Sequence, residues 1–350
     1  MKISTPSLSA GKRRSIAANQ QALVQWSPLF IDREPPVLCQ PAARDLDLSQ
    51  WARAHRDEIE ARLLKHGAIL FRGFPNVDVA AFNDCIDAIS GGALEYRFRA
   101  SPRTQIRSDM NLYTSTDYPA EEQIFPHNEH SYSPIFPLHL YFYCEMPASS
   151  GGETPLGDTR ALLNRIRPDV REAFERRRIM YVRNYGDGMG LPWPTVFQTT
   201  EREVVEQYCK TVGIEVEWRS RDRLRTRQVS PAIVRHAHTG ELVWFNHATF
   251  FNEWTLPAVM RDQLRAEYAA DELPQNTFFG DGEPIGHETI LHLQQAYRDV
   301  MRHFPWHRGD VVLIDNMLTM HARNSFAGAR RILTGMARAC RNSDLEVPAV

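Results

Sequence analysis

The stretch Pro126-His-Asn-Glu-His-Ser-Tyr132 places His127 two residues before Glu129. On an extended backbone, residues two apart leave the same face, so this spacing aims an imidazole and a carboxylate at one metal ion. A third ligand must come from a distant part of the chain. We expect it to be His321, in a stretch (309–331) predicted to be a strand followed by a charged loop. The sequence therefore predicts a metal site made of two histidines and one carboxylate.

Many short apolar runs surround this motif, and their pattern predicts the fold. The expected strands cover 68–71, 138–144, 181–185, 214–218, 233–238, 242–245, 308–315 and 332–339. The expected helices cover 51–65, 79–89, 201–210, 258–269 and 288–303. Short strands with helices before and between them are typical of an antiparallel sandwich or jelly roll. We predict a mainly β fold with flanking α-helices, a flexible tail over 1–25 and one catalytic domain over 26–350.

The bulk composition is that of a soluble globular protein. Of the 350 residues, 43% are hydrophobic and 24% are charged, and the formal net charge of -2 gives no electrostatic drive toward nucleic acid or an anionic membrane. The five cysteines are scattered without CxxC spacing, which disfavours a zinc ribbon or a disulfide framework. No apolar run is long enough to span a membrane. We expect a cytoplasmic protein with reduced thiols; its oligomeric state is not indicated.

A rival metal site involves the predicted hairpin. His236 and His238 share one face of it, with His247 nearby, and Glu241 is the carboxylate across the turn. Such a set binds zinc or iron in a cupin-like barrel. Under this alternative the chain is a non-catalytic or zinc-binding jelly-roll module.

Two further residues, Thr154 and Arg331, indicate that the predicted metal site is that of an oxygenase. Two histidines and a carboxylate on one side of a metal leave open positions, as in non-haem Fe(II) oxygenases. A 2-oxo acid chelates such an iron, and its far carboxylate then needs an arginine fork and a hydroxyl. Thr154 follows the first motif and Arg331 follows His321 by ten residues, so both are candidates for that carboxylate.

These motifs, in this order, resemble the Fe(II)/2-oxoglutarate-dependent dioxygenases of the TauD/TfdA superfamily. The resemblance runs from His66-Gly-Ala-Ile-Leu-Phe-Arg-Gly-Phe74 to Arg330-Arg331 and includes Gly151-Gly-Glu-Thr154 and Asp315–His321. It implies a double-stranded β-helix in which His127, Glu129 and His321 bind Fe(II). It also implies that Thr154 and Arg331 hold 2-oxoglutarate, with O2 as the other cosubstrate.

Two departures from the superfamily pattern bear on the substrate. The acidic ligand is Glu129 where most members have Asp, which is similar to the clavaminate synthase-like branch, including SyrP-like enzymes. Gly335 stands four residues after Arg331, where taurine dioxygenase carries a sulfonate-binding arginine, so taurine is not the expected substrate. An iron halogenase would have a small residue in place of Glu129.

The resemblance implies that 2-oxoglutarate is decarboxylated to succinate while an unactivated C–H bond is hydroxylated; desaturation or cyclisation on the same iron site is the alternative outcome. The expected substrate is an amino acid or amino-acid derivative, free or tethered to a carrier protein, in secondary-metabolite biosynthesis. The polar stretch 101–123 either shapes the site's entrance or is a plain surface connection. The candidate substrate contacts are Arg103, Arg107, Asp117, Asn128, His247 and Arg323.

Overall fold

The structure is a computed structural model that describes residues 23–30, 34–95, 104–107, 109–115, 118–186, 191–219 and 223–348. Its largest element is a sheet of strand order β1-β2-β3-β17-β7-β20-β5-β4, in which all pairs except β2–β3 are antiparallel. The strands are β1 (Val24–Pro28), β2 (Val37–Pro41), β3 (Ala68–Phe71), β4 (Gln105–Arg107), β5 (Met110–Thr114), β7 (Ile135–Met146), β17 (Val311–Asp315) and β20 (Arg331–Arg341).

A smaller sheet carries the metal-ligand candidates. Its order is β16-β9-β18-β6, with β16 (Met301–Arg302), β9 (Leu156–Asp158), β18 (Thr319–Arg323) and β6 (Ile124–His127). A third sheet has the order β11-β12-β10-β15, with β11 (Glu215–Trp218), β12 (Leu224–Ser230), β10 (Ile179–Tyr185) and β15 (Gln275–Phe279). Two strand pairs complete the β structure: β13 (Ile233–Arg235) with β14 (Leu242–Trp244), and β8 (Ser150–Gly151) with β19 (Phe326–Ala327).

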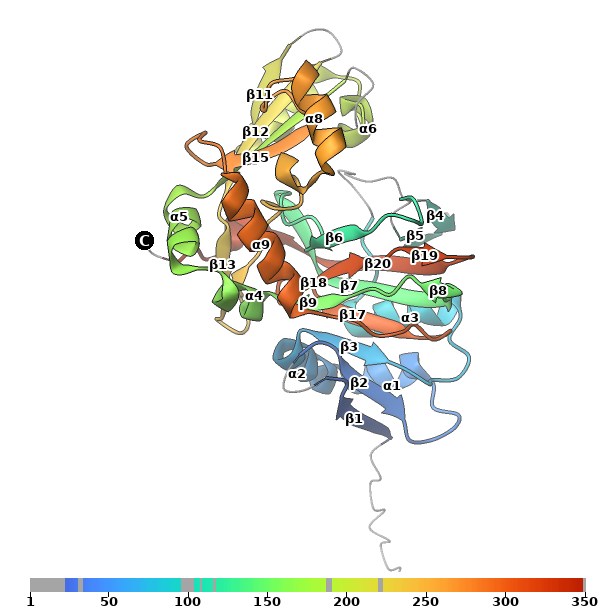
Figure 1. Cartoon of the computed structure of the whole chain (residues 1–350). Coiled ribbons are helices and arrows are strands. Elements are labelled where there is room, and N and C mark those ends of the chain that lie inside the picture. The colour runs from blue at the N-terminus through green and yellow to red at the C-terminus, as the bar shows by residue number, and fades with distance from the viewer. Residues whose placement is uncertain are drawn as a thin grey trace, which may run out of the picture.

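Helices cover the outer faces of these sheets. They are α1 (Leu48–Ala54), α2 (Arg56–His66), α3 (Val79–Ser90), α4 (Thr159–Arg165), α5 (Pro168–Arg177), α6 (Trp193–Phe197), α7 (Arg202–Thr211), α8 (Ala258–Glu267) and α9 (His287–Val300), with the 3-10 turns η1 (Glu253–Thr255) and η2 (Asn342–Asp344). Figure 1 shows α1, α2 and α3 beside the larger sheet, and the third sheet with α6 and α8 as a separate lobe. The mainly β architecture with flanking helices is as predicted. Among the described residues, no helix is both long and apolar enough to cross a membrane.

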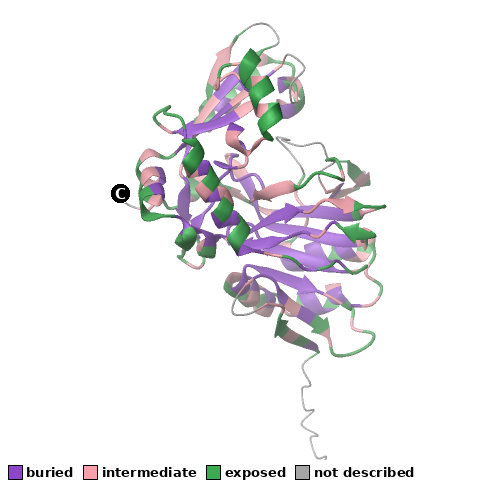
Figure 2. Ribbon diagram, in the orientation of Figure 1, coloured by how far each residue is buried: buried purple, intermediate pink, exposed green. Residues whose placement is uncertain are grey.

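The core lies on both faces of the larger sheet, as the buried central strands in Figure 2 show. In β17, Val311 and Leu313 pack in the cluster that includes the helical residue Ile59, whereas Val312 and Ile314 pack in the inner cluster. Alternate residues of a strand point to opposite faces, so an uninterrupted apolar run such as β17 is suited to a strand covered on both sides. Burying each such side chain stabilises the fold by about 1.5–3 kcal/mol.

Local signals account for several boundaries. Asp158 accepts hydrogen bonds from the Arg160 and Ala161 backbone amides and caps α4. The helix expected over 51–65 is instead two helices, because the chain leaves helical geometry at His55 (φ -125°, ψ 30°). β1 begins at Val24, so the last two residues of the predicted 1–25 tail lie in a paired strand; residues 1–22 lie outside the described part.

The polar stretch 101–123 is not a plain loop where it is described. It contains the β4–β5 hairpin, which extends the larger sheet beyond β20. Residues 101–103, 108, 116 and 117 lie outside the described part. The hairpin is stabilised because Leu112 and Tyr113, adjacent in β5, are both buried, one in each of the two core clusters that flank the larger sheet. Their burial outweighs the polar composition of the stretch.

Candidate metal centre and its pocket

Strand pairing brings together two residues that are 194 positions apart. His127 ends β6, and His321 lies in the middle of β18, directly opposite it in the antiparallel register. Their ring centroids are 4.3 Å apart. The expectation that His321 lies in a loop after a strand is wrong, since it belongs to a strand. This pairing fixes both imidazoles on one face of the smaller sheet.

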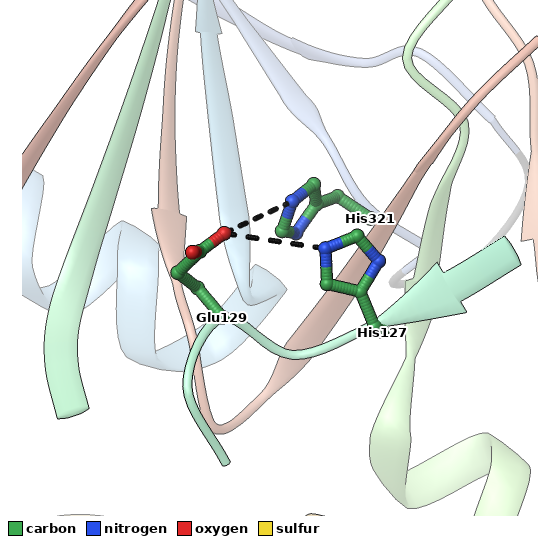
Figure 3. A group of neighbouring side chains, drawn as sticks. All are labelled: His127, Glu129 and His321. Carbon is green, nitrogen blue, oxygen red and sulfur yellow. Dashed lines mark ion pairs between the residues drawn. The ribbon is translucent and has the colours of Figure 1, made fainter. Parts of the chain in front are cut away.

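Glu129 reaches the two histidines from a turn. β6 ends at His127, so the expectation that His127 and Glu129 leave one face of an extended strand is wrong. The Oε2 atom of Glu129 lies 4.0 Å from His127 Nε2 and 3.8 Å from His321 Nε2 (Figure 3). Two ligand atoms about 2.0–2.2 Å from one ion lie at most about 4.4 Å apart. Both distances are within this limit, so the three donors fit one metal ion.

A hydrogen bond at Nδ1 of His127 leaves its Nε2 atom available to bind a metal. Its Nδ1 lies 2.9 Å from the Phe125 carbonyl oxygen, which can only accept a hydrogen bond, so Nδ1 carries the proton. The Nε2 atom, which faces Glu129, is then an unprotonated ligand. His127, Glu129 and His321 form the group of potential metal ligands found among the described residues. Their ligand atoms lie close enough together to bind one ion.

Asn316, which sequence reasoning missed, holds the turn that carries Glu129. Its Nδ2 donates to the Glu129 carbonyl (2.8 Å) and the Pro137 carbonyl (2.9 Å), and its Oδ1 accepts from the Glu129 amide (2.7 Å). Asn316 is fully buried and lies between β17 and β18, the strand of His321. One side chain therefore ties the carboxylate turn to the segment that delivers the second histidine.

His130 contacts the other oxygen of the Glu129 carboxylate. The His130 Nε2 atom lies 3.4 Å from Glu129 Oε1, while Oε2 faces the two histidines. His130 has φ 55°, a left-handed conformation that a non-glycine residue adopts at some energetic cost. The backbone thus places an imidazole against the carboxylate oxygen that faces away from the metal cluster.

This arrangement predicts an effect on metal affinity. His130→Phe should weaken Fe(II) binding by roughly 10- to 100-fold, the usual range for losing a residue that orients a ligand. His130→Gln, whose polar amide can occupy the same position beside Glu129, should lose less. Competition with a coloured Fe(II) chelator measures both constants. Equal Fe(II) affinity in wild type and His130→Phe would show that this contact does not orient Glu129.

A pocket of about 370 Å³ opens beside the two histidines. Its lining also includes Thr154, Arg323 and Arg330, with Phe142, Ile124 and Ile332 as apolar walls. Within the described residues neither arginine pairs with a carboxylate: Arg323 donates to the backbone carbonyls of residues 118, 119 and 122, and Arg330 donates to Gly152, Ser115 and Thr154. Burial and the nearby Arg323 lower the pKa of Arg330 to about 10, so the Arg330 guanidinium is charged at neutral pH. The pocket therefore favours an anion.

Thr154 and Arg330 both line this pocket and are hydrogen-bonded to each other. The Thr154 Oγ1 atom accepts from Trp306 Nε1 (3.2 Å) and from Arg330 Nη2 (3.4 Å), so its own proton is directed elsewhere. Arg330 lies across Gly152, where an added Cβ would come within 3.0 Å of the arginine side chain. Gly152 also has φ 73°. The glycine is needed both for the turn and for the close approach of Arg330.

The structure corrects the choice between two adjacent arginines. Arg331 points to solvent, with half of its side chain exposed, and pairs with Glu145 at 2.7 Å. Arg330, not Arg331, lines the pocket. Successive residues entering β20 point to opposite faces, so a one-residue error in register exchanges the two sides. Counted from Arg330, the position four residues later is Thr334 instead of Gly335. Neither residue is an arginine, so the argument against taurine is unchanged.

The remaining sequence-based candidates fall into four groups. His247 and Arg323 are near the cluster: the His247 ring lies 5.8 Å from that of His127, and Arg323 lines the pocket. Asn128 is corrected to a scaffold residue, because it is fully buried and its Nδ2 donates to the Asn316 carbonyl at 2.6 Å. Arg107 is exposed and paired with Asp109, away from the pocket lining. Arg103 and Asp117 lie outside the described residues.

The rival site does not assemble. His236 Nε2 lies 3.0 Å from Asp315 Oδ2, and its Nδ1 accepts from the backbone amides of His238 and Thr239. Both ring nitrogens of His236 are therefore engaged. Glu241 pairs with Arg160 instead. Asp315 in turn accepts from the Met317 and Leu318 amides, so this buried pair supports the turn before β18.

Comparison of the chain with known proteins identifies its family. The model of the "Taurine catabolism dioxygenase TauD, TfdA family" matches residues 33–337. The chain belongs to the TauD/TfdA dioxygenase family. The expected enzyme class and its cofactors, Fe(II) and 2-oxoglutarate, are confirmed by this membership, and the alternative of a non-catalytic module is wrong.

Two curated relatives and one solved structure illustrate the similarity. The dapdiamide synthesis protein DdaC of Enterobacter agglomerans is 34% identical over 78% of this chain and 83% of its own length. A clavaminate synthase-like protein of Arabidopsis thaliana is 28% identical over 83% of this chain and 87% of its own. The PvcB structure from Pseudomonas aeruginosa has a TM-score of 0.56 at 16% identity, covering 94% of this chain and 98% of that one. The jelly-roll prediction is thereby confirmed.

Proposed function

We propose that His127, Glu129 and His321 bind Fe(II) and that Arg330 and Thr154 bind the far carboxylate of 2-oxoglutarate. The observation that carries this proposal is a pocket lined by both metal-ligand histidines and, beside them, by an arginine that has no carboxylate partner among the described residues. A 2-oxo acid spans such a pocket, because one end chelates metal and the other is a carboxylate that fits an arginine fork.

The chain's own residues prepare this pocket in three ways. The Phe125 carbonyl holds the proton of His127 on Nδ1 and leaves Nε2 for the metal. Arg330 and Thr154 orient the cosubstrate, and the apolar walls Phe142, Ile124 and Ile332 limit the access of water. Bound Fe(II) would supply the activation of O2, with 2-oxoglutarate as the electron donor that leaves as succinate and CO2.

The reaction we propose is hydroxylation of an unactivated C–H bond in an amino acid or amino-acid-derived compound, free or bound to a carrier protein, during secondary-metabolite biosynthesis. The similarity to DdaC, a dapdiamide synthesis protein, supports a biosynthetic role. PvcB, described as an Fe, alpha-ketoglutarate dependent oxygenase from an isonitrile synthetic pathway, shares the fold. Glu129 in place of aspartate supports the clavaminate synthase-like branch.

The setting we propose is a single catalytic domain in the cytoplasm. The family match over residues 33–337 supports one domain. The five cysteines are free thiols, and four of them are buried, which supports a reducing compartment.

Anaerobic absorbance with Fe(II) and 2-oxoglutarate tests the site. We expect a weak visible charge-transfer band in the wild-type protein and none in Glu129→Ala, because the substitution removes one of three metal ligands. His238→Ala is the matched control: His238 belongs to the rival histidine pair and is exposed, so the band should persist. A band that survives in Glu129→Ala but disappears in His238→Ala would reverse the assignment. Succinate release on addition of candidate amino acids then identifies the substrate.

A further inference from the structure

A second pocket lies against the metal-ligand turn, on the side of the third sheet. It is open to solvent, has a volume of about 490 Å³ and is lined in part by aromatic side chains. Its lining includes Tyr132, three residues after Glu129, and Phe197 of α6. The floor is formed by β10 and β12, two strands of the lobe that Figure 1 shows beyond β6. The turn that carries Glu129 therefore continues directly into the wall of this second pocket.

One cation occupies the middle of the floor. Tyr181, Arg183 and Tyr185 alternate along β10, so their side chains share one face of the sheet. Gln228 is the cross-strand partner of Tyr181, and Thr226 is that of Arg183. All five residues line the pocket. Arg183 is thus flanked along its strand by two tyrosines and across the sheet by polar side chains.

Arg183 has no counter-ion in the described part of the chain. Its guanidinium carbon lies 5.3 Å from the ring centroid of Tyr132 and 5.1 Å from that of Tyr185. No ion pair or hydrogen bond of its side chain is found among the described residues. Most of the described arginines with comparable exposure pair with carboxylates, such as Arg227 with Glu217 at 3.0 Å. A guanidinium held between aromatic rings without a carboxylate is suited to the carboxylate of a ligand.

Two packed aromatic rings lie between this pocket and the metal cluster. The Tyr132 ring lies 4.9 Å from that of His247, which lies 5.8 Å from that of His127. Ser131, next to Tyr132, is 2.6 Å from His247 Nδ1 through its hydroxyl. An anion at Arg183 is therefore separated from His127 by two aromatic rings. A carboxylate held by Arg183 is therefore remote from the metal cluster.

We propose that this pocket binds the carboxylate end of an extended organic substrate, with Arg183 as the residue that selects the anion. The rings of Tyr132, Tyr185 and Phe197 contact the apolar part of the molecule next to its carboxylate. The substrate class that follows is an amino-acid derivative with a carboxylate remote from the reacting C–H bond. The inference rests on the proposed function, since it takes the metal cluster as the reacting centre.

Hippurate, which joins an aromatic ring to a carboxylate, and its uncharged amide N-benzoylglycinamide are matched probes for this pocket. Calorimetry on the full-length protein with Fe(II) and saturating 2-oxoglutarate, without oxygen, should show hippurate binding about tenfold more tightly than the amide, the value of one charge-assisted hydrogen bond. Arg183→Met, which keeps the length of the side chain, should abolish the preference, and Arg183→Lys should retain part of it. Bound hippurate should also perturb the visible band in wild type but not in Arg183→Met.

Three outcomes would overturn the proposal. They are equal binding of hippurate and its amide to the wild-type protein, competition between hippurate and 2-oxoglutarate, and Arg183-dependent binding that leaves the visible band unchanged. The last would show an anion site that is not part of the substrate path. Failure of the proposed function is separate from these, because it is the absence of the band in wild type before any hippurate is added.

Discussion

Arg330→Leu should weaken 2-oxoglutarate binding by roughly 100-fold or more, whereas Arg331→Leu should leave it within about twofold of wild type. Losing one partner of a buried, hydrogen-bonded charge pair costs about 2–5 kcal/mol, and Arg330 is the arginine that contacts Thr154 in the pocket. Arg331 is half exposed and pairs with Glu145 on the surface, where an ion pair contributes little. Titration of the visible band with 2-oxoglutarate measures both constants.

The same titration has an expected pH dependence. Because burial and Arg323 lower the pKa of Arg330 to about 10, the guanidinium stays charged through neutral pH. It loses its proton as the pH rises through that value. The affinity for 2-oxoglutarate should therefore be unaffected by Arg330 near neutrality and should fall as the pH approaches 10. If Arg331→Leu were the more damaging of the two substitutions, the correction from Arg331 to Arg330 would be wrong.

Asn316→Leu should destabilise the protein and abolish the Fe(II)·2-oxoglutarate band. The substitution leaves the Glu129 amide and the Glu129 and Pro137 carbonyls buried without the partners that they have in the native structure. Each such group costs about 1–3 kcal/mol, so we expect a loss of roughly 3 kcal/mol or more in the free energy of unfolding. The turn that carries Glu129 also loses its tie to the strand of His321. Denaturant unfolding measures the first effect and anaerobic absorbance the second.

Two further variants separate stability from positioning. Asn316→Asp has the same shape and keeps the oxygen that accepts from the Glu129 amide, but it loses the donor to the two carbonyls. It should lie between wild type and Asn316→Leu. Asn128→Leu removes the Nδ2 donor of the neighbouring buried asparagine and should cost less. An Asn316→Leu protein with wild-type stability and an intact band would refute the role assigned to Asn316.

Patterns in neighbouring residues were sufficient for much of the fold. The apolar run of β17, the cap at Asp158 and the helix over 79–89, observed as α3, follow from burial, capping and periodicity, which act between residues close in the chain. The cluster of His127, Glu129 and His321 could also be predicted, because their residue types and order resemble a known family. The role of these side chains as metal ligands depends on their residue types, which are read directly from the sequence.

Long-range pairing decided the rest. Whether Arg330 or Arg331 faces the pocket depends on how the chain enters β20, and a shift of one residue exchanges the two faces. The role of Asn316 depends on backbone groups almost two hundred positions away, and that of Arg183 on aromatic rings from another segment. Residue types identify the groups that can do chemistry, but register and packing between distant strands determine which of them meet.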